Sequence, residues 1–96
     1  MIPFEFKAQL WQYSGKSGWH FLNIPTKISL EIRSMFKSEE EGWGRLKTKA
    51  TINEVSWDTA IWFNSEGNMY LLPVKTEIRK KAQLKAGDNL SIRIEF

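Results

Sequence analysis

The chain has 96 residues, a formal net charge of +3 and no cysteine. This length predicts one domain over residues 1–96, and the missing cysteines exclude disulfides and thiolate metal sites and fit a reducing, cytoplasmic compartment. The longest apolar runs are only a few residues, far short of the roughly 20 that a membrane helix needs, so we expect no membrane partner.

The first half of the chain begins with strand patterns. Residues 4–10 alternate apolar and polar side chains, as a half-buried strand does. Residues 14–18, which read Ser-Gly-Lys-Ser-Gly, predict a loop. Residues 19–24 predict a second strand that ends at Pro25. Beyond Pro25 the apolar residues recur at the spacing of one helix face: Ile28, Ile32, Met35 and Phe36.

More predicted strands follow after a polar loop. Residues 46–52 and 55–63 predict a hairpin that turns at Asn53-Glu54. Residues 69–72 predict a further strand, which Pro73 ends. A second helix over 76–83 and a last strand over 90–96 complete the chain.

The element order is therefore β-β-α-β-β-β-α-β, which predicts a mainly β fold with two short helices. Pro25 and Pro73 each end a strand, each begin a Pro-x-Lys sequence, and each precede an apolar helix position, Leu30 and Ile78. This echo predicts two β-β-α-β halves related by a pseudo-two-fold axis. The alternative is chance, because a strand, a proline and a helix often follow one another.

The tail of the chain resembles a known helix-turn-strand unit. Its sequence reads Glu77-Ile78-Arg79, then Leu84-Lys85, then Gly87-Asp88, and then Leu90 and Ile92. This spacing resembles one half of AbrB/MazE-type transition regulators and antitoxins. In that family two chains each supply half of a double-split β-barrel.

The whole chain is similar to the domain of unknown function 1905 family. The matching motifs are Phe4-x-Phe6-x-Ala8-x-Leu10, Gly18-Trp19-x-Phe21, Pro25, Ala50-Thr51-Ile52, Trp57, Gly67-x-x-Tyr70-x-Leu72-Pro73, Arg79-Lys80 and Gly87-Asp88. The resemblance implies a small double-split β-barrel formed by a single chain. It implies no activity.

The chemistry-bearing residues do not form a recognisable catalytic set. His20 is the only histidine, and a triad or a metal site needs partners that the sequence does not offer. The acids at residues 39–41 form one charge run without a second carboxylate at a fixed distance, so a solvated loop is the better interpretation. We expect no enzyme activity, no metal and no cofactor.

Exposed aromatic residues give the leading functional hypothesis. Trp57 and Trp62 have opposite parity within 55–63, so if Trp57 points inward Trp62 points outward. Trp11 is likewise out of phase with the apolar positions of 4–10. Exposed aromatic side chains mark interaction surfaces. The sequence therefore predicts a binding module for an unknown protein or small ligand, with Trp11, His20 and Trp62 as its surface, unless the helices cover these positions.

Basic residues support a second hypothesis. Arg45, Lys47 and Lys49 share one strand face, and Arg79 and Lys80 lie on the second helix. These five residues could contact phosphates, as in an AbrB-like nucleic-acid-binding domain. Lysines on a strand also prevent edge aggregation, and basic residues late in a helix favour its dipole. Nucleic acid is therefore the alternative partner, not the favoured one.

Overall fold

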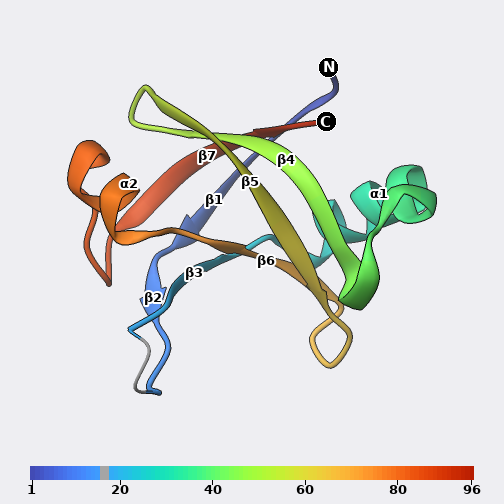
Figure 1. Ribbon diagram of the computed structural model, residues 1–96, viewed down its shortest axis with the longest axis horizontal. Coiled ribbons are helices and arrows are strands. Elements are labelled where there is room, and N and C mark those ends of the chain that lie inside the picture. Colours follow the sequence, from blue (N-terminus) through green and yellow to red (C-terminus); the bar gives the residue numbers. More distant parts are fainter. Residues whose placement is uncertain (16–17) are drawn as a thin grey trace.

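The structure is a computed structural model that describes residues 1–15 and 18–96 (Figure 1). Its main elements are β1 (Pro3–Gln9), β2 (Trp11–Gln12), β3 (His20–Asn23), α1 (Thr26–Phe36), β4 (Arg45–Ile52), β5 (Val55–Asn64), β6 (Met69–Pro73), α2 (Thr76–Ala82) and β7 (Asn89–Glu95). The predicted mainly β fold with two helices is confirmed. The predicted loop over 14–18 includes Lys16 and Ser17, which lie outside the described residues.

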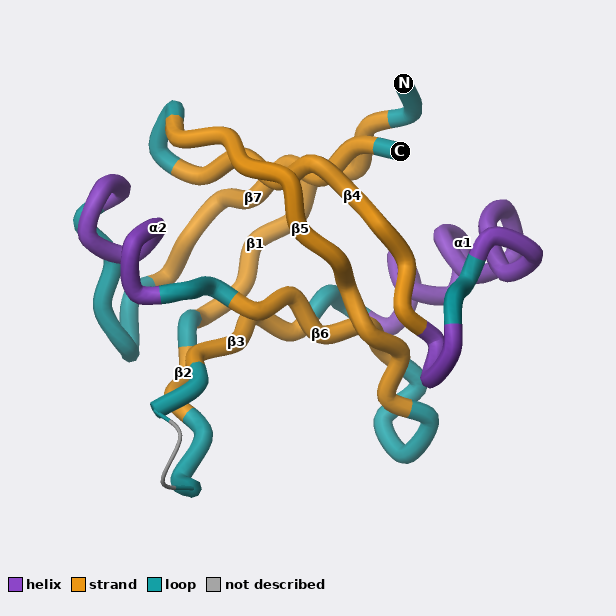
Figure 2. Tube along the Cα trace, viewed as in Figure 1, coloured by secondary structure: helices purple, strands orange, loops and turns teal. Residues whose placement is uncertain are grey.

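The strands form one curled antiparallel sheet in the order β1-β7-β4-β5-β6-β3-β2. β1 and β2 stand at opposite ends of this order, yet only Leu10 separates them along the chain. The Leu10 N–H donates to the Asp88 carbonyl at 2.9 Å, and its carbonyl accepts from Gly87 N–H at 2.8 Å. One continuous segment thus joins the two ends of the sheet, which gives a barrel-like shape with a helix at each end (Figure 2).

Alternating side chains fill the interior as predicted. In β5, Ile61 is fully buried and Trp57 is partly buried, whereas Trp62 is exposed. The predicted apolar face of α1 is wrong at Met35, which is half exposed. The buried face of this helix includes Ser29 instead. The helix is therefore rotated about its axis relative to the predicted orientation, and Met35 lies at the edge of the face that contacts the core.

The strand pairing maps onto itself when the first half of the chain is exchanged with the second. β5 is the counterpart of β1 and β2 together, so the β2–β3 pair corresponds to β5–β6 and the β1–β7 pair corresponds to β5–β4. The β3–β6 and β4–β7 pairs each correspond to themselves. At the centre Leu22 lies opposite Leu72. Two equivalent backbone bonds of 2.9 Å flank this pair: Ile24 N–H to the Tyr70 carbonyl and Val74 N–H to the His20 carbonyl.

This register corrects the predicted correspondence between the halves. If Leu22 and Leu72 are equivalent positions of the two halves, then Ile28 is equivalent to Ile78. Pro25 and Pro73 are therefore not equivalent. Ile28 and Ile78 both pack against the core. Leu30, the predicted counterpart of Ile78, is exposed.

Ser29 and Arg79 occupy equivalent positions and bond equivalent carbonyls. The Ser29 hydroxyl donates to the Ile24 carbonyl at 2.9 Å, and the Arg79 Nη1 donates to the Val74 carbonyl at 2.7 Å. Ser29 also accepts from Tyr70 N–H at 2.9 Å. Each helix is thereby tied to the residue that directly follows the preceding strand, and the buried Ser29 hydroxyl links α1, the end of β3 and β6.

Replacing Ser29 by alanine is expected to lower the free energy of unfolding by about 1–2 kcal/mol, because the buried Tyr70 N–H loses its acceptor. Urea denaturation measures this loss. The matched control is Ser34→Ala, whose exposed hydroxyl donates only to the Glu31 carbonyl of its own helix; we expect a change within about 0.5 kcal/mol. Equal effects of the two substitutions would contradict the bridging role of Ser29.

Candidate functional site

Aromatic side chains gather on the outer surface of β2, β3, β5 and β6. They line a shallow depression of about 520 Å³ that we call the aromatic face, formed by Trp11, Tyr13, Trp19, Phe21, Trp62, Asn64, Leu71 and Pro73. Trp62 is 48% exposed and Trp19 is 47% exposed. Large exposed apolar groups in one patch are a recognised sign of an interaction surface.

The strand register explains why Trp11 and Trp62 meet on this face. Trp11 lies opposite Phe21 in the β2–β3 pair, and Trp62 lies opposite Leu71 in the β5–β6 pair. Because Phe21 and Leu71 are equivalent in the two halves, the two tryptophans are equivalent as well. Trp62 is exposed as predicted, Trp11 is only partly exposed, and the fold brings both into one depression.

Contacts within the aromatic face hold its rings in place. The Trp11 Nε1–H donates to the Asn23 Oδ1 at 2.8 Å. The Phe21 ring lies 5.2 Å from the Trp11 ring and 5.8 Å from the Trp19 ring, and the latter pair is stacked with an interplanar angle of 11°. Rings that are already fixed lose little conformational entropy when a ligand binds.

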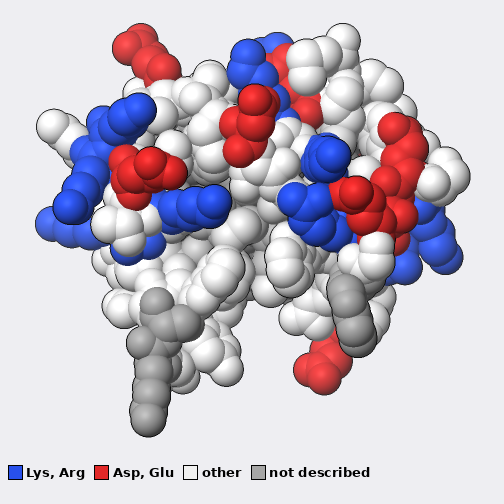
Figure 3. Space-filling view, in the orientation of Figure 1, with Lys and Arg blue, Asp and Glu red and all other residues white. Residues whose placement is uncertain are grey.

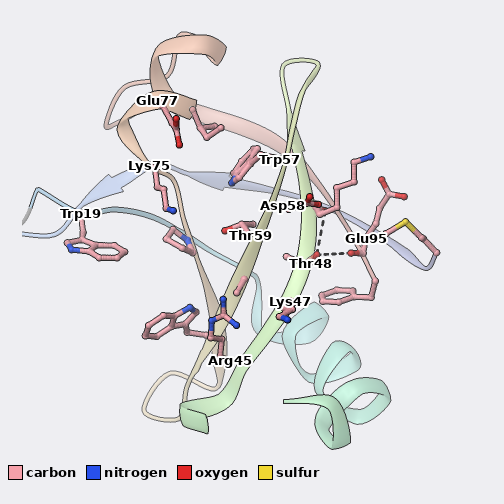
Figure 4. A pocket seen from close by; sticks show the side chains of 17 residues that line it. Trp19, Arg45, Lys47, Thr48, Trp57, Asp58, Thr59, Lys75, Glu77 and Glu95 are labelled. Carbon is pink, nitrogen blue, oxygen red and sulfur yellow. Dashed lines mark hydrogen bonds between the residues drawn. The ribbon is translucent and has the colours of Figure 1, made fainter. Parts of the chain in front are cut away.

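A wider groove of about 780 Å³ continues from the aromatic face over β4, β5 and the start of α2 (Figure 4). Trp19, Trp62 and Pro73 line both depressions. The charged side chains in the groove are Arg45, Lys47, Lys49, Lys75, Asp58, Glu77 and Glu95. We call this the charged groove.

Positive charge lies at the aromatic end of the charged groove. On β4, Arg45 lies opposite Trp62, whereas Lys49 lies opposite Asp58, which comes four residues before Trp62 in β5. On the other wall, Lys75 follows closely after β6 and Glu77 lies deeper in α2. Arg45 and Lys75 point into the groove from opposite walls (Figure 4), and Figure 3 shows Lys and Arg side chains on both sides of an uncharged hollow.

His20, the third residue of the predicted surface, lies elsewhere. It lines a separate depression together with Lys75 and Arg79. Its Nδ1 lies 2.8 Å from the Gly18 carbonyl, which makes Nδ1 the donor. The structure therefore places Trp11 and Trp62 on one face but does not bring His20 to them.

The predicted basic set is divided between two places. Arg45, Lys47 and Lys49 line the charged groove, and Arg45 forms a 2.6 Å ion pair with Glu41. Arg79 donates to the Val74 carbonyl and to the Thr76 Oγ1 at 3.0 Å, so its guanidinium anchors the start of α2. Lys80 is exposed on α2 and lines neither the aromatic face nor the charged groove.

Trp19, Phe21 and Lys75 also belong to the site, although they were not among the site residues predicted from the sequence. The alternation within 19–24 carried a signal for the first two, because Leu22 and Ile24 are fully buried and the intervening parity must point outward. Lys75 carried no such signal. It lines the groove together with Trp57 and Asp58 of β5, which are distant from it in the sequence.

The described residues hold no group of three or more His, Asp or Glu side chains that could bind a metal ion. No helix in the described part of the chain is long and apolar enough to cross a membrane. The eight residues of the aromatic face include no carboxylate, histidine or lysine, so this face offers ring surfaces and amide groups to a ligand.

Residues 6–94 match the model of a protein family described as Domain of unknown function (DUF1905). No curated protein matches the chain.

Proposed function

We propose, for a chain that belongs to the DUF1905 family, that it is a non-catalytic binding module whose ligand lies on the aromatic face. The observation that carries the proposal is the pairing of Trp11 and Trp62 at equivalent positions of the two halves, on one exposed patch. Rings that are fixed by Asn23 and Phe21 give a rigid platform for a ligand with flat or apolar surfaces.

The proposal includes the double-split form of the barrel. Its support is how the halves meet: β3 and β6 pair over 21–23 with 71–73, β4 and β7 pair over 49–51 with 93–95, and each of these two pairs corresponds to itself when the halves are exchanged. Within each half, β2 pairs with β3 and β5 pairs with β6. The first strand of each half also pairs with the last strand of the other half: β1 with β7, and β5 with β4. The aromatic face lies over the β3–β6 contact, where the two halves join.

The lining of the aromatic face supports binding over catalysis. General acid–base or nucleophilic chemistry needs a convergent set of titratable side chains. Among the described residues, Tyr13 is the only titratable residue on this face, and its side chain is half exposed. Asp58 and Glu77 lie in the charged groove, beyond the aromatic residues.

The test is a proton–nitrogen NMR titration that follows the indole N–H signals. Three probes are added separately: an oligothymidylate, a neutral cello-oligosaccharide and an uncharged aliphatic peptide. We expect at least one of them to shift the indole signals of Trp11, Trp19 and Trp62 while the amides of Lys7 and Ser91, which pair in β1 and β7 away from this face, stay unchanged. Unchanged indole signals with all three probes would overturn the proposed function.

A further inference from the structure

We infer that the aromatic face and the adjoining charged groove together bind single-stranded nucleic acid. This inference rests on the proposed function and adds the chemical class of the ligand. Proteins that bind single strands combine aromatic rings, on which unpaired bases stack, with cations that contact the phosphates. Both parts are present here, side by side, because Trp19 and Trp62 line the aromatic face and the charged groove alike.

The ring surfaces suit unpaired bases. Trp19 stacks on Phe21 on one side and remains 47% exposed, and Trp62 is 48% exposed. Each therefore offers free ring area to a planar group. A base in a duplex is covered by its neighbours in the stack, so it could not use these rings without leaving the helix.

The charges suit phosphates at the same place. Arg45 is the strand neighbour of Trp62, Lys47 follows two residues along β4, and Lys75 approaches from the opposite wall. No described residue forms an ion pair with Lys47 or Lys75. At the far end of the groove Asp58 and Glu77 would repel phosphate. The expected footprint is therefore short and centred on the tryptophans.

These charges also argue against other occupants. A neutral oligosaccharide would stack on tryptophan but would leave Lys47 and Lys75 without an anionic partner among the described residues. A second copy of the chain, docked face to face about a two-fold axis, would bring Arg45, Lys47 and Lys75 of both copies together. Like charges placed opposite one another disfavour such an interface.

The experiment is a fluorescence titration of the intact chain with an oligothymidylate of about ten nucleotides. We expect quenching of the tryptophan emission and a roughly tenfold loss of affinity between about 50 and 200 mM salt, because two to three phosphate contacts give a logarithmic slope of about −1.4 to −2.1. A self-complementary DNA duplex of the same length is titrated in parallel, and it should bind more weakly.

Three variants locate the site. Trp62→Ala removes one exposed ring and is expected to weaken binding by about tenfold to a hundredfold. The double change Lys47→Gln with Lys75→Gln should lower the steepness of the salt dependence by about 1.4. Lys7→Gln is the matched control, because this lysine is exposed on β1 and lines neither depression; its affinity and slope should equal those of the parent chain. Circular dichroism verifies that each variant is folded.

The outcomes separate this inference from the proposed function. Salt-dependent binding that Trp62→Ala weakens and Lys7→Gln leaves unchanged supports both. If the oligosaccharide or the peptide shifts the indole signals and the oligothymidylate does not, the ligand class is overturned and the binding face stands. Tighter binding of the duplex would also overturn the single-strand inference. Indole shifts that depend on protein concentration alone would identify the face as a contact between copies and overturn both proposals.

Discussion

Replacing Leu22 by alanine is expected to lower the free energy of unfolding by about 2–5 kcal/mol. Leu22 is fully buried and lies opposite Leu72 where the two halves of the chain pair. Truncation removes apolar area and leaves a cavity between β3 and β6, which contact each other over only three residue pairs. Small domains commonly have about 5–15 kcal/mol of stability, so this loss is a substantial fraction.

Leu30→Ala is the matched control for this prediction. Leu30 is the same residue type, but it is 47% exposed on α1. Alanine is also the better helix former, so we expect a change within about 0.5 kcal/mol. Guanidinium denaturation of both variants gives the comparison. Similar losses at the two positions would contradict the rotation of α1 and the register between the halves.

Tyr70→Phe is expected to cost about 1.5–3 kcal/mol at neutral pH, because it removes a hydrogen bond to a charged group that is almost buried. The fully buried Tyr70 donates its hydroxyl to the Glu40 carboxylate. The Glu40 side chain is only 9% exposed, and Arg33 approaches it at 3.9 Å. The substitution keeps the ring, which packs edge-on against Phe63 at 5.0 Å, so the loss reports the polar contact.

The same variant should also change how stability depends on pH. Burial, the hydrogen bond to Glu40 and the negative charge of that carboxylate raise the pKa of the Tyr70 hydroxyl above its ordinary value of 10.0. The unfolded chain therefore releases this proton at a lower pH than the folded chain does. The stability that Tyr70 contributes is complete below about pH 10 and falls as the pH rises further. Tyr70→Phe lacks this fall. The difference in the free energy of unfolding between the parent chain and the variant should therefore narrow as the pH rises above about 10.

Urea denaturation of both proteins at pH 7 and at about pH 10.5 measures the narrowing. The control is Tyr13→Phe, which changes a tyrosine that is half exposed on the aromatic face. This control should leave the stability at pH 7 within about 0.5 kcal/mol of the parent. A constant difference between Tyr70→Phe and the parent at both pH values would contradict the raised pKa.

Much of the local structure could be predicted from side-chain alternation. The turn at Asn53-Glu54, where both residues have positive φ, joins β4 to β5 as the pattern indicates. The outward position of Trp62 followed from its parity within β5. Alternation is a local property, because successive side chains of a strand point to opposite faces whatever the strand pairs with. It therefore identifies which residues are exposed without identifying their neighbours.

The site needed the long-range register as well. Trp11 belongs to the same face as Trp62 because the segment breaks at Leu10 and its last residues pair with β3 instead of β7. His20 and Arg79 looked like candidate binding residues in the sequence, yet His20 lies in a separate depression and Arg79 anchors α2. Polar side chains of this kind bind either solvent, ligand or backbone, and only their neighbours decide which.

The sequence by itself determined the order of the longer elements, although not the short strand β2, together with the mainly β class and the outward parity of the tryptophans. The tertiary structure alone decided that two tryptophans from opposite halves share one face and that Lys75 stands across a groove from Arg45. The physical reason is that periodicity fixes each strand's two faces, whereas the contacts between strands depend on pairings across the whole chain. The spacing between equivalent residues of the two halves is two residues longer than the spacing of Pro25 and Pro73. This difference is enough to change which residues meet.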